Sequence, residues 1–368
     1  SLESRGLAGG REAVARIDSP DGTPDGQGAR AAGSDIGGSA SARREARQPS
    51  GAPESRATSA LPGSNSVRQP WRYGEADGVE ITTEHFRFLT TVRDERVLSG
   101  LPVLMEGALR HYCTALGPLP WPQRRVDSYI FERRTEWADR TRELLGRNAG
   151  PYLSMGRGGY TTDAQTVLFN LGRTDTFTLS IHEGWHQYTQ ATFRDTLPVW
   201  LEEGIACYME GHRFRRSDEG PVFMPWRNME RYGELRSAAR AGQLFDLDRI
   251  LNGSPQTFLN EGRRAMLVYY AQVWALTMFL AEGEGGRYRD ALHTLVRDAA
   301  EGRFRDTLSE GGGRRRGVSP FGRSVIRAYF NTNVDEFTAQ YERFIEQILS
   351  SSSGTAVWRG QSPLESSG

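Results

Sequence analysis

The pentapeptide His-Glu-Gly-Trp-His at residues 182–186 constrains the fold of this chain more than any other feature of its sequence. Apolar residues flank it at helical spacing, including Phe177, Leu179 and Tyr188, which predicts a helix buried against a core. On a helix, positions i and i+4 project from one face about a turn apart, so the two imidazoles can bind one metal ion. Glu183 is placed to take a proton from a water on that ion rather than to bind the ion itself. The alternative is an ordinary amphipathic helix with two histidines on its surface.

A third candidate ligand follows on a second predicted helix. Sixteen residues separate His186 from Glu203, which lies in the segment Leu-Pro-Val-Trp-Leu-Glu-Glu-Gly-Ile-Ala at residues 197–206. The small Gly204 in this segment permits the close approach of another helix. A catalytic zinc site takes three protein ligands and keeps one position open for water. His182, His186 and Glu203 are therefore the predicted metal ligands.

These two segments together resemble the gluzincin zinc peptidases, of the peptidase MA superfamily. The aminopeptidase branch of that superfamily carries the segment Trp-Leu-Asn-Glu-Gly-Phe-Ala, and residues 200–206 here read Trp-Leu-Glu-Glu-Gly-Ile-Ala. In the family the glutamate before the glycine is the third zinc ligand, which the resemblance places at Glu203, with Glu202 in place of the family asparagine. The spacing after the pentapeptide is slightly shorter than in the aminopeptidases, so the resemblance is to the superfamily rather than to that branch.

A closer resemblance is to the bacterial peptidase-MA-like domains of the DUF1570 type, over roughly Glu80 to Leu349. The shared features are a strand near Glu84-His85-Phe86, a Gly-Tyr strand before the pentapeptide, a glutamine directly after it, the 197–206 segment, and Tyr-Ala-Gln-x-Trp at residues 270–274. This resemblance implies a zincin-like fold, a bound Zn2+ and hydrolysis of a peptide or protein substrate. Glu183 would activate the water on the zinc.

An additional side chain usually helps to stabilise the oxyanion in this family. Tyr270 is the candidate that the resemblance implies, because it opens the Tyr-Ala-Gln-x-Trp motif downstream of the glutamate ligand. Tyr269 is the rival, and core packing with a satisfied hydroxyl is the alternative for both tyrosines. His212 is a further candidate, although an exposed histidine is the simpler interpretation.

The order of the predicted elements indicates an α+β fold, with a small mixed sheet followed by a mainly helical C-terminal subdomain. Periodicity predicts strands and helices over the following ranges: strands at Val79–Leu89, Val126–Phe131 and Thr166–Asn170, and helices at Val92–Leu116 and Thr135–Leu145. From Thr176 to Leu349 helical spacing dominates, with breaks at Gly and Pro residues. In zincins the strand before the active helix often forms the sheet edge that receives an extended substrate, so Thr166–Asn170 is either that edge or a plain structural edge strand.

Composition divides the chain into three parts. Residues 1–70 are rich in Gly, Ser, Pro and Arg and poor in large apolar residues, which predicts a disordered leader. Residues 71–349 form the predicted metallopeptidase domain, and residues 350–368 are expected to be a flexible tail. The leader could tether the domain to an export signal, which favours a location outside the cytoplasm, while a cytoplasmic tail of similar composition is the alternative.

The charges and cysteines exclude several classes of function. All 46 basic residues are arginine, so lysine-dependent chemistries such as a P-loop or a Schiff base are impossible. The formal net charge is zero, and no nucleic-acid partner is expected. With two cysteines, Cys113 and Cys207, there is no cysteine-based zinc cluster, and Cys207 is expected to be a small buried thiol. The longest apolar stretch, Met266–Leu280, predicts a buried helix rather than a transmembrane segment.

Glu202 and Glu210 are expected to be solvated side chains. As an alternative to peptidase activity, the chain could be a zincin-fold protein that retains zinc and acts as a binding or scaffolding module. An intact Glu183 favours the enzyme, because a module without catalysis has no need of the base.

Overall fold

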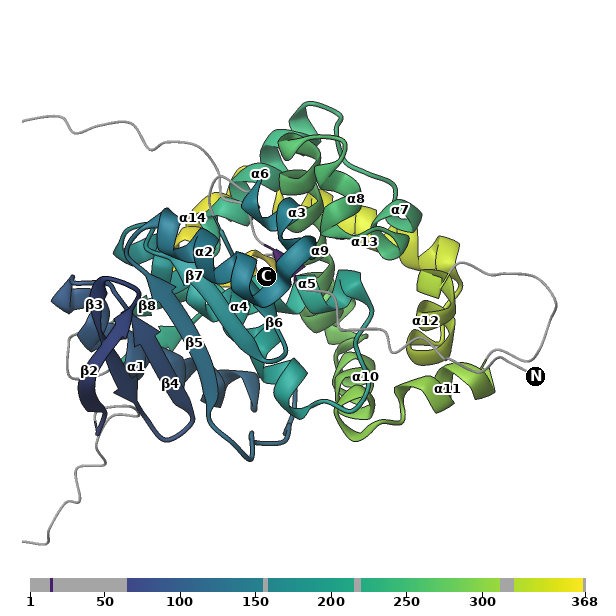
Figure 1. The fold of residues 1–368 in the computed structure, drawn as a ribbon. Coiled ribbons are helices and arrows are strands. Elements are labelled where there is room, and N and C mark those ends of the chain that lie inside the picture. Colours follow the sequence, from purple (N-terminus) through teal and green to yellow (C-terminus); the bar gives the residue numbers. More distant parts are fainter. Residues whose placement is uncertain (1–13, 16–64, 155–157, 215–219, 312–320, 367–368) are drawn as a thin grey trace, which may run out of the picture.

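One side of the protein is a mixed β-sheet and the other is a group of helices (Figure 1). The computed structural model describes residues 14–15, 65–154, 158–214, 220–311 and 321–366. Within these ranges the sheet has the strand order β1-β6-β7-β5-β4-β3-β2. The strands are β1 Val14–Ala15, β2 Val67–Tyr73, β3 Ala76–Thr82, β4 Phe86–Thr90, β5 Val126–Phe131, β6 Gly159–Thr162 and β7 Gln165–Phe169. The α+β class predicted from the sequence is confirmed.

The sheet is parallel in its centre and antiparallel at both edges. Strands β4, β5 and β7 are parallel, whereas β2, β3 and β4 form successive antiparallel pairs. On the other side, β6 pairs antiparallel with β7, and the two residues of β1 pair antiparallel with β6. The strand expected at Thr166–Asn170 is β7, and it lies between β5 and β6. The prediction that this strand could be the sheet edge is therefore wrong, since β6 lies outside it.

One predicted strand is in fact two. The sequence alternates over Val79–Leu89, but the structure turns between β3 and β4. Thr83 donates its backbone N–H to the carbonyl of Phe86 at 2.9 Å, and Phe86 donates its N–H to the Thr83 hydroxyl at 3.1 Å. A threonine side chain thus closes a turn that contains neither Gly nor Pro, so the usual turn signal is absent.

Helices α1, α2 and α3 alternate with the sheet strands in the chain, the other helices follow the last sheet strand, and helices cover both faces of the sheet. Among the described residues they are α1 Glu95–Tyr112, α2 Arg134–Leu145, α3 Gly150–Leu153, α4 Arg173–Thr192, α5 Val199–Met209, α6 Met229–Arg240, α7 Leu247–Asn252, α8 Pro255–Leu259, α9 Arg263–Gly286, α10 Arg289–Glu301, α11 Phe304–Gly311, α12 Phe321–Phe330, α13 Val334–Ile348 and α14 Ser353–Arg359. A two-stranded hairpin, β8 His212–Phe214 and β9 Pro221–Phe223, was not predicted.

Different helices pack on the two faces of the sheet, as the alternating side chains of its strands show. Ser128 on β5 lies 3.2 Å from the Gln187 amide oxygen of α4, so even-numbered positions of β5 face α4. On the opposite face, Trp137 of α2 donates its ring N–H to the Val167 carbonyl at 3.2 Å. Helix α4 is therefore held directly on the sheet, and its side chains reach β5, β6 and β7.

Helix α9 forms the centre of the helical side. It packs against α5, α6, α8 and α13, and it is the described helix long and apolar enough to cross a membrane by length and composition alone. Within its apolar window 89% of the residues are buried inside the fold, which is typical of a core helix. A Cβ at Gly204 of α5 would lie 2.3 Å from the Thr277 hydroxyl and 2.6 Å from the Val273 carbonyl of α9. Gly204 thus permits the close helix approach that the sequence indicated.

The segment expected to be a flexible tail differs from that expectation. It contains α14, in which Ser353 and Val357 are buried, with Val357 in the main core. A short helix and two apolar residues, Val357 and the partly buried Leu364, dock this segment, a signal too weak to distinguish in a Ser- and Gly-rich sequence. At the other end, β2 begins at Val67, slightly before the expected domain start. Most of the expected leader lies outside the described residues.

Candidate metal centre

The two histidines of the pentapeptide and Glu203 meet in the interior between α4 and α5. His182, His186 and Glu203 each have at most 1% of their surface exposed. The Nε2 atoms of the histidines are 3.3 Å apart, and Glu203 Oε2 lies 3.4 Å from His182 Nε2 and 3.7 Å from His186 Nε2. Two residues one turn apart on α4 and one on α5 therefore direct three ligand atoms at one point, as their spacing predicted.

These distances match the ligand–ligand separations of a tetrahedrally coordinated ion. Ligand atoms about 2.0–2.1 Å from a tetrahedral zinc lie about 3.3–3.4 Å from one another. Two of the three separations fall at that value and the third is a few tenths of an ångström longer. The site therefore needs little rearrangement to hold a divalent ion through these three residues.

The Nδ1 atoms of both histidines contact carboxylates that the sequence had suggested were solvated. His182 Nδ1 lies 2.8 Å from Glu210 Oε1, and His186 Nδ1 lies 3.1 Å from Glu202 Oε1. Glu210 is 2% exposed, and the side chain of Glu202 is 16% exposed. The expectation for both glutamates is thus wrong. Position 210 lies two helical turns beyond Glu203, so the Glu210 side chain lies on the same side of α5 as Glu203 and points into the interior.

A carboxylate at Nδ1 determines which ring nitrogen carries the proton. An ionised carboxylate only accepts hydrogen bonds, so each Nδ1 must donate and each neutral ring leaves an unprotonated Nε2. Two Nε2 lone pairs and a Glu203 oxygen then face one another. Neither carboxylate oxygen of Glu203 accepts a hydrogen bond from any residue in the described part of the chain. Three converging acceptors without a donor are unfavourable unless a cation or protons lie between them.

Glu210 is itself held by two further buried side chains. Arg231 of α6 donates to Glu210 Oε1 at 3.0 Å, and Asn228 donates to Oε2 at 2.7 Å. Arg231 is fully buried, and its guanidinium lies 5.1 Å from the ring centre of Tyr270. The orientation of His182 therefore depends on a charged network that extends from α5 into α6. Sequence reasoning did not find this network, because Arg231 and Asn228 belong to no spaced motif.

Glu183 lies beside the cluster with one oxygen held and one without a partner. The Thr161 hydroxyl of β6 is 2.9 Å from Glu183 Oε2 and 3.1 Å from the Glu183 carbonyl oxygen. Glu183 Oε1 is buried and has no hydrogen-bond partner within the described ranges. A buried carboxylate oxygen without a donor is unfavourable, so the arrangement suits a water molecule bound at that oxygen. Thr161 had not been singled out from the sequence.

Burial and the neighbouring charges shift the pKa values of this cluster in opposite directions. Burial raises the pKa of Glu183, and the two imidazoles only partly offset that effect. For Glu203, burial also acts to raise the pKa, but the two histidines outweigh it and the pKa is lowered. Burial acts to lower the pKa of His186, while Glu202 and Glu203 raise it well above its usual value. The cluster thus favours an ionised Glu203, as a ligand requires, and a Glu183 that holds a proton more readily than an exposed glutamate.

The two candidate tyrosines lie at different distances from the cluster. The ring of Tyr270 packs edge-on against the His182 ring, with centroids 6.0 Å apart. Tyr269 stacks on Phe258 at 4.5 Å, and its buried hydroxyl has no hydrogen-bond partner among the described residues. Burial raises the pKa of both hydroxyls well above the usual value, so both are neutral at physiological pH. Tyr270 is the tyrosine whose ring reaches a predicted ligand.

The remaining candidates have structural partners. His212 begins β8, and its Nδ1 lies 2.8 Å from the carbonyl oxygen of Glu210, so it is partly buried rather than exposed. Cys207 and Cys113 are buried, and neither forms a disulfide within the described residues. Cys207, His182 and Glu210 could form another metal-binding group, but the Glu210 carboxylate already bonds to His182, Asn228 and Arg231. The His182, His186 and Glu203 group has its ligand atoms available.

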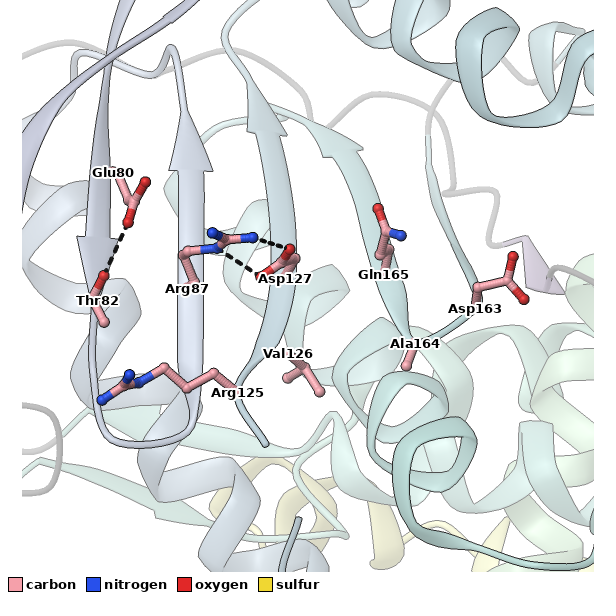
Figure 2. Close-up of a pocket in the computed structure, with 9 residues that line it drawn as sticks. All are labelled: Glu80, Thr82, Arg87, Arg125, Val126, Asp127, Asp163, Ala164 and Gln165. Carbon is pink, nitrogen blue, oxygen red and sulfur yellow. Dashed lines mark hydrogen bonds and ion pairs between the residues drawn. The ribbon is translucent and has the colours of Figure 1, made fainter. Parts of the chain in front are cut away.

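A polar groove of about 590 Å³ lies elsewhere, on the α2 face of the sheet. Figure 2 shows Arg87 paired with Asp127 on adjacent strands, with Gln165 on the next strand and Asp163 and Ala164 at the β6–β7 turn. Because Asp127 and Ser128 point to opposite faces, this groove is separated by the sheet from α4 and its histidines. Its two most central charges neutralise one another, and it takes no part in the metal centre.

A buried His/His/Glu group beside a glutamate defines this chain as a candidate metal-binding protein. Residues 177–302 match the family described as "Protein of unknown function (DUF1570)". That segment contains the three candidate ligands, Glu183 and both tyrosines, and over it the resemblance to the DUF1570 type is supported. No curated protein and no solved structure matches the chain.

Proposed function

We propose that this chain is a zinc-dependent hydrolase of peptide bonds, as the resemblance to gluzincin peptidases implies. The observation that carries the proposal is the convergence of His182 Nε2, His186 Nε2 and Glu203 Oε2 within 3.7 Å of one another in the buried interior. Two nitrogens and one carboxylate oxygen suit zinc, and three protein ligands leave a coordination position open. Zinc, when bound, supplies a Lewis acid that makes water more acidic and polarises a carbonyl group.

The residues of the chain would then perform the proton transfers and the positioning. Glu183 accepts a proton from the attacking water at Oε1, the oxygen that no described residue bonds. Thr161 holds the other oxygen at 2.9 Å and so fixes the orientation of the carboxylate. Burial raises the pKa of Glu183, which favours its later donation of that proton to the leaving amine.

A catalytic role explains Glu183 better than a scaffolding role does. A buried carboxylate oxygen without a hydrogen bond destabilises a folded protein by about 1–3 kcal/mol. A binding module would have no physical reason to retain such a group, whereas a general base must keep one oxygen available to water. The zinc-binding module without peptidase activity is therefore the second candidate function.

The test compares Glu183→Gln with the unsubstituted chain after both are loaded with zinc. We expect one zinc per chain in both proteins by elemental analysis, and hydrolysis of an unfolded protein substrate about 10²–10⁴-fold slower in the variant. Glu106→Gln is the matched control, because Glu106 is a buried glutamate that contacts His85 instead of the cluster. It should leave both zinc content and rate unchanged.

Each other outcome has a defined meaning. Equal rates in the Glu183→Gln variant and the unsubstituted chain would reject the general base. Zinc retained without hydrolysis in either protein would favour the binding module. Zinc retained by a variant that lacks both His182 and His186 would reject the metal site itself.

A further inference from the structure

Helix α4 carries a second row of polar side chains beside the row that provides the two histidines. Residues four and seven positions apart lie on one face of a helix, so Glu183, Gln187 and Gln190 form one row. Glu183 contacts the Thr161 hydroxyl of β6, and the two glutamines bond to strands and to a turn on the same side. This row therefore faces the sheet, whereas the histidine row faces α5.

The turn between β6 and β7 has a backbone conformation that its sequence does not favour. Its two central residues, Asp163 and Ala164 (Figure 2), have φ angles of 49° and 57°, and a two-residue turn of type I′ requires a positive φ at both positions. Alanine rarely adopts a positive φ, because its Cβ then lies too close to the following carbonyl oxygen. Such a conformation persists where the surrounding structure holds it. The contacts of Ala164 therefore show what keeps this turn in place.

Both backbone polar groups of Ala164 are held by glutamines of α4. The Ala164 N–H donates to Gln190 Oε1 at 3.0 Å, and Gln187 Nε2 donates to the Ala164 carbonyl oxygen at 3.0 Å. Gln187 Nε2 also donates to the Asp127 carbonyl of β5 at 2.7 Å, and Gln190 Nε2 donates to the Thr161 carbonyl of β6 at 3.4 Å. These two glutamines, the glutamine clamp, thus fix the β6–β7 hairpin at one position along α4.

The same hairpin carries the residue that orients the proposed general base. Thr161 lies three positions before Ala164, and its hydroxyl is 2.9 Å from Glu183 Oε2 and 3.1 Å from the Glu183 carbonyl oxygen. A hydrogen bond is lost when its two heavy atoms are about 3.6 Å apart, so a shift of the hairpin by less than about 1 Å would release the carboxylate. Because both oxygens belong to one carboxylate, the direction of Oε1 depends on this bond at Oε2.

We propose that Gln187 and Gln190 are positioning residues for the reaction. They hold the β6–β7 hairpin on α4, so that Thr161 orients Glu183 and directs Oε1 toward the attacking water. The role in hydrolysis rests on the proposed function, whereas the effect of the glutamine clamp on the orientation of Thr161 does not. The two parts are therefore measured separately.

Gln190→Met in the full chain removes one half of the glutamine clamp with a side chain of similar length. Gln190 is partly exposed and Gln187 fully buried, so this variant disturbs the core less than a change at Gln187. Scalar couplings of the Thr161 methyl group, measured by NMR on the metal-free protein, report the χ1 angle of Thr161. We expect a single rotamer in the unsubstituted chain and averaging between rotamers in the variant, with exchange of the Ala164 amide roughly fivefold faster, as for one lost hydrogen bond. Gln256→Met, at an exposed position of α8, is the matched control and should change neither measurement.

Hydrolysis by the zinc-loaded proteins tests the positioning role. Gln190→Met should lower kcat about tenfold and leave KM and zinc content unchanged, because it alters the orientation of Glu183 and not the ligands. Thr161→Val removes the hydroxyl through which the glutamine clamp acts, so adding Gln190→Met to Thr161→Val should cause no further loss of kcat. A glutamine that only supports the fold would instead lower kcat by the same factor with and without the Thr161 hydroxyl.

The outcomes separate this inference from the proposed function. An unchanged kcat in Gln190→Met, or equal losses with and without the Thr161 hydroxyl, would refute positioning through Thr161. Equal methyl couplings in Gln190→Met and the unsubstituted chain would overturn the effect of the glutamine clamp on Thr161. If the zinc-loaded unsubstituted chain does not hydrolyse the substrate, the proposed function has failed, and the couplings still decide whether the glutamine clamp orients Thr161.

Discussion

Replacing Glu210 with glutamine should weaken zinc binding more than the same replacement of Glu202. Both carboxylates hold the Nδ1 of a predicted ligand, at 2.8 Å and 3.1 Å respectively. Glu210 is 2% exposed, so water cannot substitute for it, whereas the Glu202 side chain is 16% exposed. Loss of a carboxylate that orients a ligating histidine typically lowers metal affinity tenfold to a hundredfold, about 1.4–2.8 kcal/mol.

The surroundings of Glu210 place its loss at the upper end of that range. Asn228 Nδ2 donates to Glu210 Oε2 and also to the Cys207 carbonyl. In Glu210→Gln, an NH₂ group in place of Oε2 would therefore point at the Asn228 NH₂ group, and two donors would face each other. The side chain would then turn away from either His182 or Asn228. For Glu202→Gln we expect a loss below about tenfold, since solvent reaches the Glu202 side chain, which is 16% exposed.

The assay is competition for zinc against a fluorescent chelator of known affinity, at a pH near 7.5. Glu106→Gln serves again as the control, because it alters a carboxylate–histidine pair outside the centre. Circular dichroism and thermal melting of the metal-free proteins report on the fold. A Glu210→Gln variant with the affinity of the unsubstituted chain, or a larger loss in Glu202→Gln, would refute the reasoning.

Arg231 requires a second comparison. Without Glu210, the ion-pair partner left to its buried guanidinium among the described residues is Glu230 at 3.2 Å. Breaking a buried ion pair destabilises a protein by about 3–5 kcal/mol. Adding Arg231→Met to Glu210→Gln should restore part of the stability and none of the zinc affinity. Restored affinity would show that the uncompensated guanidinium, rather than the orientation of His182, caused the loss.

Three further predictions concern the fold and the ion. Gly204→Ala should destabilise the protein by about 2 kcal/mol or more in urea unfolding, because the added Cβ would lie 2.6 Å from the Val273 carbonyl. Gly233→Ala in α6 is the control and should be neutral or slightly stabilising, since a Cβ there meets nothing within 4 Å. Equal effects of the two substitutions would contradict the close crossing of α5 and α9. Burial lowers the pKa of His111 from 6.5 to about 4. Between these two pH values the unfolded chain binds more protons than the folded chain, so the free energy of unfolding decreases as the pH falls, by at most about 3 kcal/mol. The free energy of unfolding measured from pH 7 to 4 should decrease less in His111→Phe than in the unsubstituted chain. Zinc at a hundred times its dissociation constant should add about 2.7 kcal/mol to the stability of the unsubstituted chain, measured as a rise in melting temperature, and nothing to that of a variant lacking His182 and His186.

The ligand set could be predicted from the sequence because its geometry is local. Two histidines four positions apart on a helix meet on one face whatever the rest of the fold does, and α4 covers residues 173–192 as the apolar spacing indicated. Glu203 lies on another helix, and the prediction for it used the resemblance of residues 200–206. The structure brings all three together.

The supporting residues could not be predicted, because their contacts depend on tertiary packing. Thr161 reaches Glu183 only because β6 folds back beside β7, and Arg231 reaches Glu210 across 21 positions of sequence. The position of β6 outside β7 was missed for the same reason. Strand order is a property of the whole sheet, and alternation within one segment does not reveal it.

The two helices that provide the ligands belong to different parts of the protein. Helix α4 is attached to the sheet by the hydrogen bonds of Gln187 to β5 and of Thr161 to Glu183. Helix α5 instead packs closely against α9 at Gly204. An ion bound to both would therefore act as a cross-link between the sheet and the helical side. Sliding of α5 relative to the sheet by even one ångström would change the separations of 3.4 Å and 3.7 Å that join Glu203 to the imidazoles, and with them the fit of an ion between the two sides.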